Sequence, residues 1–241
     1  MKDTITLNSD TYFGGKGGAG MYQTIINQIP PHRGFLSGCL GHCAIMRKKL
    51  PAEYNIGCDP DPDVIQVWKD ANAEKLLNMR LWNGCIQDYN IQINLAAIGG
   101  HQFNLDDWFI YLDPPYPLDS INGKSRYNFK MSDEQHIELL ELIKDLPIKI
   151  AISTYPNKLY RRYLREWRCL EFKAKTRQRI ATELLYMNYP EPTDLHDYRY
   201  LGKNFKEREH IKLKFERWKN NLHQLPPLEV SMRKNYILSK L

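Results

Sequence analysis

The sequence predicts an α/β fold whose core is a Rossmann-like, mostly parallel sheet of seven strands. Short apolar strands alternate with segments of helical periodicity, which is the pattern of repeated βα units. Five such units are followed by two strand candidates, Cys169–Thr176 and Glu183–Tyr189, that are joined by the short linker Arg177–Thr182. A linker this short makes an antiparallel hairpin, because a parallel connection needs a dozen or more residues.

The N-terminal part carries two glycine-rich segments. The first, Tyr12–Gly20, lacks the Gly-Lys-Ser/Thr ending of a phosphate-binding loop and offers Lys16 as a cation. Its alternative interpretation is a flexible turn. A helix is predicted over Met21–Ile29 and a strand over Gly34–Leu36. The second glycine-rich segment, residues 37–43, joins this strand to a helical segment through Ala44–Met46, and together they form the first βα unit.

The second strand, Tyr54–Cys58, ends at Asp59, about 20 residues after the glycine loop. A carboxylate at this spacing holds the ribose hydroxyls in dinucleotide-binding folds. Asp61 and Asp63 compete for that role. Asp63 also fits as the N-cap of a helix over Val64–Ala73.

The apolar strand Trp108–Leu112 ends abruptly in Asp113-Pro114-Pro115-Tyr116. Proline lacks an N–H and has a fixed φ, so the strand stops at the acid and a stiff loop follows at its carboxyl end. Ligands bind at that end in open α/β sheets. A carboxylate, a carbonyl and a flat ring suit a planar substrate that bears an amino group.

The remaining elements complete the pattern. A third strand ends near Leu81–Cys85, a helix capped by Ser132 and Gln135 buries Ile137, Leu140 and Leu142, a strand covers Ile148–Ser153, and a basic helix covers Lys158–Arg165. The amphipathic helix Asn204–Leu225 and a last helix from about Leu228 form a tail. We expect two parts: a main domain over residues 1–193, and a basic helical extension over residues 194–241 that packs on it.

Size and composition favour a globular protein. The chain has 241 residues, 42% hydrophobic and 26% charged. No apolar run approaches the roughly 20 residues of a membrane span, and Met1–Thr6 has no signal-peptide pattern, so we expect a cytoplasmic protein, monomeric or a weak dimer, without a membrane partner. Five cysteines, an odd number, indicate reduced thiols.

The positive charge is concentrated in two segments. Residues 158–179 hold nine basic and two acidic side chains, a net charge of +7, and residues 201–241 hold ten basic and four acidic ones, a net charge of +6. A segregated basic surface favours a polyanionic partner, although solvated helix faces would have the same composition.

Taken together, these motifs resemble the DNA N6-adenine methyltransferases of the GATC-methylase (D12) type, in particular the short phage and prophage members. Tyr12-Phe13-Gly14-Gly15-Lys16 resembles the N-terminal cofactor motif, residues 35–44 stand at the glycine motif, and Asp113–Tyr116 matches the catalytic Asp-Pro-Pro-Tyr. Residues 182–192 and 195–202 resemble the C-terminal signature of the short phage group. The resemblance covers nearly the whole chain.

The resemblance implies S-adenosylmethionine as cofactor, and double-stranded DNA with a flipped adenine as substrate. The residues that it implies are catalytic Asp113, Pro114 and Tyr116; cofactor-binding Tyr12, Gly15, Lys16, Ser37, Gly41, Asp59, Cys85 and Asp113; and DNA-binding Lys124, Arg126, Tyr127, Arg161, Arg177 and Arg179. Accepting the adenine N–H bonds on Asp113 and on the Pro114 carbonyl aims the nitrogen lone pair, and Tyr116 offers a stacking face. Restriction–modification and phage functions are among those that the family serves.

The sequence departs from the family pattern in three places, one of which is Cys43, where the family has the closing glycine of its glycine motif. Ser37-Gly38-Cys39 stands where the family has Glu-Pro-Phe, and Cys85 stands where an Asp contacts the cofactor adenine, with Asp88 as a substitute. Cysteines at neighbouring strand ends can bind metal, but their spacing matches no standard motif, so no metal is predicted. Two alternative functions stay open: a ribosomal RNA base N-methyltransferase, and a non-catalytic DNA-binding relative with an eroded cofactor site.

Overall fold

The protein is described by a computed structural model over residues 5–7, 16–18, 20–91, 94–95, 104–117, 129–175 and 180–240. One sheet of seven strands forms its core, in the order β3-β2-β1-β4-β5-β7-β6. The strands are β1 Gly34–Ser37, β2 Tyr54–Asp59, β3 Met79–Asn83, β4 Trp108–Leu112, β5 Lys149–Thr154, β6 Arg168–Lys175 and β7 Ile180–Met187.

Helices precede, connect and follow these strands along the chain. They are α1 Met21–Ile26, α2 Ala44–Lys48, α3 Pro62–Asp70, α4 Ala73–Leu76, α6 Asp133–Lys144, α7 Lys158–Tyr163, α8 Phe205–His223 and α9 Pro227–Leu238. Short 3₁₀ turns η1 Ile86–Asp88, η3 Leu105–Asp107 and η5 Tyr198–Tyr200 complete the described elements.

Strand directions confirm the predicted fold class. Strands β3, β2, β1, β4 and β5 are parallel, whereas β7 runs antiparallel to both β5 and β6. The chain order reverses beside β1, where β2 pairs with one edge of the strand and β4 with the other. Such a switch point is where open α/β sheets bind their ligands.

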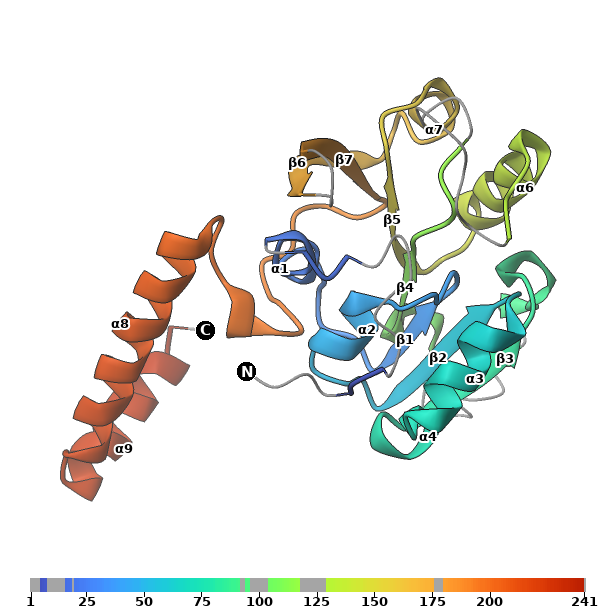
Figure 1. Ribbon diagram of the computed structural model, residues 1–241. Coiled ribbons are helices and arrows are strands. Elements are labelled where there is room, and N and C mark those ends of the chain that lie inside the picture. The colour runs from blue at the N-terminus through green and yellow to red at the C-terminus, as the bar shows by residue number, and fades with distance from the viewer. Residues whose placement is uncertain are drawn as a thin grey trace. The chain divides into compact units, whose positions relative to one another are not determined.

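Both faces of the central strands are buried. Trp108, Ile110 and Leu112 of β4 belong to a core cluster that includes Leu139 and Ile143 of α6. Phe109 and Tyr111 alternate to the other face, where the ring of Phe109 stacks on Phe35. Figure 1 shows α6 on one side of the sheet and α1 and α2 on the other. Burial on two sides explains the continuous apolar run of β4.

The direction of β7 determines which of its residues reach the carboxyl edge of the parallel strands. In the β5–β7 pairing, Thr154 at the end of β5 lies opposite Leu184. Because β7 is antiparallel, its first half therefore lies at the edge where Asp113 follows β4. This places Glu183 close to the loop of Asp113.

Several predicted boundaries and contacts were wrong by small amounts. Strand β3 begins at Met79 and ends before Cys85. The N-cap of α3 is Asp61 and not Asp63, because the Asp61 side chain accepts the Asp63 N–H. In α6, the helical period puts Leu139 and Ile143 with Leu140 in the core and leaves Ile137 and Leu142 half-buried.

The capping box of α6 is confirmed. The Ser132 hydroxyl accepts the Gln135 N–H at 3.3 Å, and the Gln135 side chain accepts the Ser132 N–H at 2.9 Å. The hairpin is confirmed as well, with β7 starting at Ile180, earlier than predicted.

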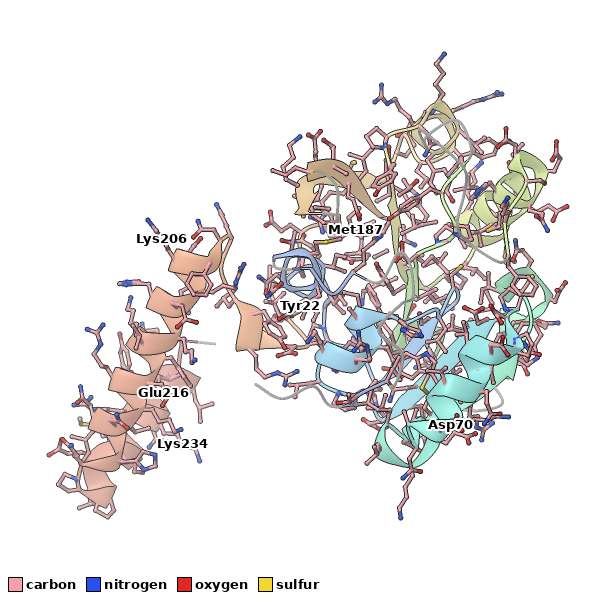
Figure 2. The ribbon with its side chains drawn as sticks, viewed as in Figure 1. Tyr22, Asp70, Met187, Lys206, Glu216 and Lys234 are labelled. Carbon is pink, nitrogen blue, oxygen red and sulfur yellow. The ribbon has the colours of Figure 1, made fainter. Side chains whose placement is uncertain are left out.

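The chain divides into two compact units, Met1–Asp197 and Tyr198–Leu241. The second holds α8 and α9, in which no described side chain is buried; Phe215 and Trp218 are 56% and 46% exposed. Lys206 and Glu216 project from α8 and Lys234 from α9 (Figure 2). The predicted packing of this tail on the main domain stays a prediction. Among the described residues, no helix is long and apolar enough to cross a membrane.

Candidate active site

The loop after β4 is the centre of the candidate site. Asp113 follows the strand directly and keeps 17% of its side chain exposed, whereas Pro114 and Tyr116 are buried. Strands β1 and β5 flank β4, so the glycine loop after β1 and the end of β5 border Asp113. The loop therefore occupies the predicted position at the carboxyl edge.

Lys16 lies beside this loop and is 2% exposed. Its ammonium Nζ lies 2.9 Å from Asp113 Oδ1 and 3.2 Å from Glu183 Oε2, and it donates a hydrogen bond to the Tyr116 hydroxyl. The contact to Glu183 is an ion pair without hydrogen-bond geometry. Thus a residue 97 positions before Asp113 in the sequence neutralises part of its charge.

Burial and neighbouring charges shift the pKa of Asp113 and of Lys16. Burial raises the pKa of Asp113 to about 6; the nearby Glu183 adds to the rise and the Lys16 ammonium opposes it. Burial alone would lower the pKa of Lys16, but the charges of Asp113 and Glu183 outweigh it and raise that pKa well above its ordinary value. Lys16 is therefore a cation at neutral pH, and Asp113 is mostly a carboxylate above pH 6.

The ring of Tyr116 is enclosed. It packs against Tyr155 with ring centroids 4.1 Å apart, and Lys16 Nζ lies 4.8 Å from its centroid. The Tyr116 hydroxyl donates to Glu183 Oε1 over 3.4 Å, and the residue is only 7% exposed. A base can stack on Tyr116 only after one of these neighbours moves.

Glu183 is a site residue to which the sequence analysis gave no role. It stood within the C-terminal signature, and its signal was a single acid in a strand that is otherwise apolar from Leu184 to Met187. It is 2% exposed. A buried acid is paired in nearly all proteins, so this pattern predicts a basic partner, but not which one.

The predicted cofactor side of the site is built around Asp59. Its Oδ2 accepts the Gly41 N–H at 2.7 Å, and its Oδ1 accepts the Asp61 N–H at 3.0 Å. Gly41 has φ +42°, a left-handed conformation that suits glycine, and its carbonyl accepts the Trp68 indole N–H at 2.7 Å. The Asp59 side chain thus holds the glycine loop at the end of β2, and the predicted cofactor roles of Gly41 and Asp59 stay predictions.

Ser37 and Cys85 complete this side. Ser37 ends β1 and is fully buried, and its hydroxyl has no well-aligned hydrogen-bond partner among the described residues. Cys85 is half-buried just after β3; burial raises the pKa of its thiol, with Asp88 and Asp59 adding to the rise. All five cysteines are free, and the described residues contain no cluster of three or more possible metal ligands.

Several predicted site residues lie outside the described residues. They are Tyr12 and Gly15 on the cofactor side, and Lys124, Arg126, Tyr127, Arg177 and Arg179 on the DNA side. Their roles stay predictions.

Arg161 is the predicted DNA contact that the structure describes. It lines an open cavity of about 460 Å³ between α7 and the β6–β7 hairpin. Arg165 and Trp167 line the same cavity, with Tyr186 and Glu171 beside them. Two guanidinium groups next to an indole suit a phosphate and a neighbouring base.

Comparisons with known proteins found similar solved structures but no similar sequence. No protein-family model and no curated sequence matches the chain. Similar solved structures include M. capricolum TrmK bound to S-adenosyl-homocysteine (11% identity, 91% of this chain and 95% of that one, TM-score 0.42). Others are an rRNA methylase from Streptococcus thermophilus (9%, 69% and 93%, 0.45) and a methyltransferase from Pyrococcus furiosus (17%, 76% and 90%, 0.45). Such low scores carry no argument about cofactor or substrate, so the fold assignment depends on this chain's own strand order.

Proposed function

We propose that the protein transfers a methyl group from S-adenosylmethionine to the N6 amino group of an adenine in DNA. The observation that carries this proposal is the Asp113-Pro114-Pro115-Tyr116 loop at the carboxyl end of β4, next to the switch point of a seven-stranded sheet with an antiparallel β7. The motif is a local feature of residues 113–116, whereas its position depends on the strand pairings of the whole sheet, and the two agree.

Asp113 would accept one N–H of the target amino group. The lone pair of an aromatic amine is delocalised into its ring, so the nitrogen is a poor nucleophile. A carboxylate bonded to one hydrogen and the Pro114 carbonyl bonded to the other favour a pyramidal nitrogen and aim its lone pair. Asp113 can perform this role only when ionised, and its pKa of about 6 leaves it mostly ionised at pH 7 and above.

The residues present fit S-adenosylmethionine on chemical grounds. A carboxylate has about four acceptor sites, and Asp59 gives two of them to Gly41 and Asp61, so acceptor sites remain for ribose hydroxyls. Asp113 and Glu183 carry two negative charges against the single positive charge of Lys16, and this net charge of −1 suits a sulfonium. When bound, S-adenosylmethionine would supply an electrophilic methyl group.

The nucleic acid would be held by the basic segments. Arg161 and Arg165 can contact phosphates, which positions the strand without specifying its sequence. The N6 atom lies inside a stacked duplex, so the adenine has to be flipped out before it can reach Asp113. Protection from restriction and a phage role are compatible with this activity.

Nucleoside analysis by mass spectrometry tests the proposal. The protein is incubated with S-adenosylmethionine and either duplex DNA or structured RNA, and the products are digested to nucleosides. We expect N6-methyladenine in the DNA. Methylated nucleosides in the RNA alone would replace the DNA assignment with an RNA one. No product from either, together with no calorimetric binding of S-adenosylmethionine at millimolar concentration, would contradict the methyltransferase proposal and favour a non-catalytic nucleic-acid-binding protein.

A further inference from the structure

The Lys16 ammonium occupies the place that the proposed target amino group needs. It is bonded to Asp113 Oδ1 at 2.9 Å, the carboxylate that would accept the target N–H. It also donates to the hydroxyl of Tyr116, the ring on which the base would stack, and so lies at the hydroxyl end of that ring. The described state of the site is therefore closed to a flipped base, and Lys16 has to move before one can enter.

Moving Lys16 into water would cost free energy at its second partner. Glu183 is 2% exposed, and removing its cation would leave a buried, uncompensated charge. Glu183 Oε2 lies 3.2 Å from the ammonium, so a small shift of Lys16 can break the contact with Asp113 and keep the one with Glu183.

We propose that Glu183 is a positioning residue that takes over the Lys16 ammonium when the target amino group binds Asp113. This inference rests on the proposed function and adds two roles to it, a substrate-mimicking cation and a second acceptor for that cation. The exchange makes and breaks only ion pairs and hydrogen bonds. Lys16 leaves Asp113, the target N–H replaces it, and the ammonium keeps its proton throughout.

The two partners differ in how firmly the fold holds them. Glu183 is in the middle of the sheet edge, paired with Phe172 of β6, while its neighbour Leu184 pairs with Thr154 of β5. Lys16 is followed by Gly17, Gly18 and Gly20, and Gly20 has φ +89°. A Cβ on Gly17 or Gly20 would meet no atom within 4 Å, so packing does not require these glycines. Their backbone freedom allows Lys16 to shift while Glu183 stays.

The other titratable groups around Asp113 remain neutral near pH 7. Burial raises the pKa of Tyr111 on β4, of Tyr160 on α7, and of the Cys39 and Cys43 thiols after β1. Among the described residues that influence Asp113, only Lys16 and Glu183 carry charge there. The acidic limb of the pH–rate profile can therefore report on this trio.

The test compares Glu183→Gln, Lys16→Met and the double variant with the wild type. In Glu183→Gln, Asp113 is the remaining acidic partner of the Lys16 ammonium. The ammonium therefore competes more strongly with the target amino group for the Asp113 carboxylate. We expect an apparent Kd for an adenine-containing duplex, measured by anisotropy with S-adenosyl-homocysteine present, to rise about tenfold, the scale of coupling between neighbouring charged groups. Loss of the Glu183 charge also lowers the pKa of Asp113, so the acidic limb of kcat/KM moves to lower pH.

The double variant separates this role from a structural one. With Lys16 gone there is no cation to compete for Asp113, and with Glu183 neutral Asp113 is the one charged group of the three that is left. The double variant should therefore bind the duplex better than Glu183→Gln does. If the two substitutions only damaged the fold, their effects on affinity would add, and the double variant would bind more weakly than either single variant. Glu141→Gln, an exposed acid on α6, is the control and should behave as the wild type.

Two outcomes are decisive. If Glu183→Gln is folded and keeps wild-type affinity and an unmoved acidic limb, or if the double variant is worse than both single ones, the inference is wrong. If the wild type transfers no methyl group although the ranking of affinities holds, the proposed function fails, while the role of Glu183 in admitting the base stands.

Discussion

At the scale of single residues, the candidate site is built on a few buried charged groups, and the fold raises the pKa of Asp113 and of Lys16. Asp113, Lys16 and Glu183 come from three segments that are distant in the sequence, yet their charged groups lie within 3.2 Å of one another along the Lys16 contacts. Each of the three is exposed by 17% or less. In the proposed function, the charges of these groups, and not their packing alone, determine whether the site can bind an amino group.

Replacement of Asp113 by alanine should abolish methyl transfer. The variant lacks the carboxylate that holds the target amino group, so we expect at least a roughly 10³-fold loss of kcat/KM, the size of effect seen when a preorganised polar group is removed from an active site. Its affinity for duplex DNA should fall by about tenfold at most, as in Glu183→Gln, because phosphate contacts provide most nucleic-acid affinity. Methyl transfer by Asp113→Ala at a rate similar to that of the wild type would refute the assigned role.

The raised pKa of Asp113 also predicts a pH-dependent effect on stability. A carboxyl group that moves from 3.8 to about 6 on folding binds more protons in the folded state, so its contribution to stability falls as pH rises through that window. Asp113→Asn has no ionisable carboxyl group at this position, so it avoids the loss of stability that deprotonation of Asp113 causes. We expect the free energy of unfolding of Asp113→Asn, relative to that of the wild type, to increase by up to about 3 kcal/mol between pH 4 and pH 7. Its melting temperature should increase in the same direction.

Thermal unfolding followed by circular dichroism measures this difference at each pH. Glu138→Gln, an exposed acid on α6, serves as the control and should give a difference that does not change with pH in this window. A flat difference for Asp113→Asn as well would show that Asp113 titrates near its ordinary pKa.

At the scale of elements, strand direction determines which residues meet. The antiparallel β7 brings the first half of its sequence to the same edge as the ends of β4 and β5. A parallel β7 would have placed Glu183 at the opposite edge. The clamp between Asp59 and Gly41 acts in the same way, because it joins the loops after β1 and β2 at the switch point.

The element formed by α7 and the β6–β7 hairpin should supply phosphate contacts. Arg161→Ala and Arg165→Ala should each weaken DNA binding and reduce the slope of log K against log salt by about 0.9 if each neutralises one phosphate. Lys144→Ala, a base at the end of α6, is the control for a general loss of positive charge. Salt titrations by anisotropy measure these slopes, and slopes equal to that of Lys144→Ala would remove the cavity from the proposed interface.

At the scale of the whole molecule, charge and core are divided between the two units. The core cluster runs from Leu36 to Tyr186 and so lies within the first unit. Residues 198–241 hold eleven basic and four acidic side chains, a net charge of +7, so the rest of the chain carries −1. The second unit therefore supplies the positive charge that the whole chain shows.

A chain truncated after Asp197 tests this division. We expect it to fold with its own cooperative transition, because it keeps the complete sheet, and to bind DNA more weakly than the full chain. The loss should be largest at low salt, since it comes from counterion release. Circular dichroism and anisotropy at two salt concentrations measure both properties. Undiminished DNA affinity would exclude the second unit from binding.

The sequence alone was sufficient to predict the order of strands and helices along the chain and the loop Asp113–Tyr116. Apolar runs and prolines depend on local physics, so β4, its end at Asp113 and the capping box at Ser132 could be predicted from neighbouring residues. Other local features could not be predicted because two neighbouring residues suit the same position. Asp61 and Asp63 compete for one N-cap. His136 is buried and the adjacent Ile137 is half-buried, so a shift of one residue in the helix decides which of them is in the core.

Only the tertiary structure decided which distant groups share the site. The sequence placed Lys16 in a glycine-rich segment and Glu183 in a strand, and neither context specifies a partner. Their contact depends on the reversal of β7 and on the approach of the N-terminal segment to β4, both of which are properties of the assembled sheet. Ion pairs between residues separated by 97 and 167 positions follow from long-range packing, which no local pattern encodes.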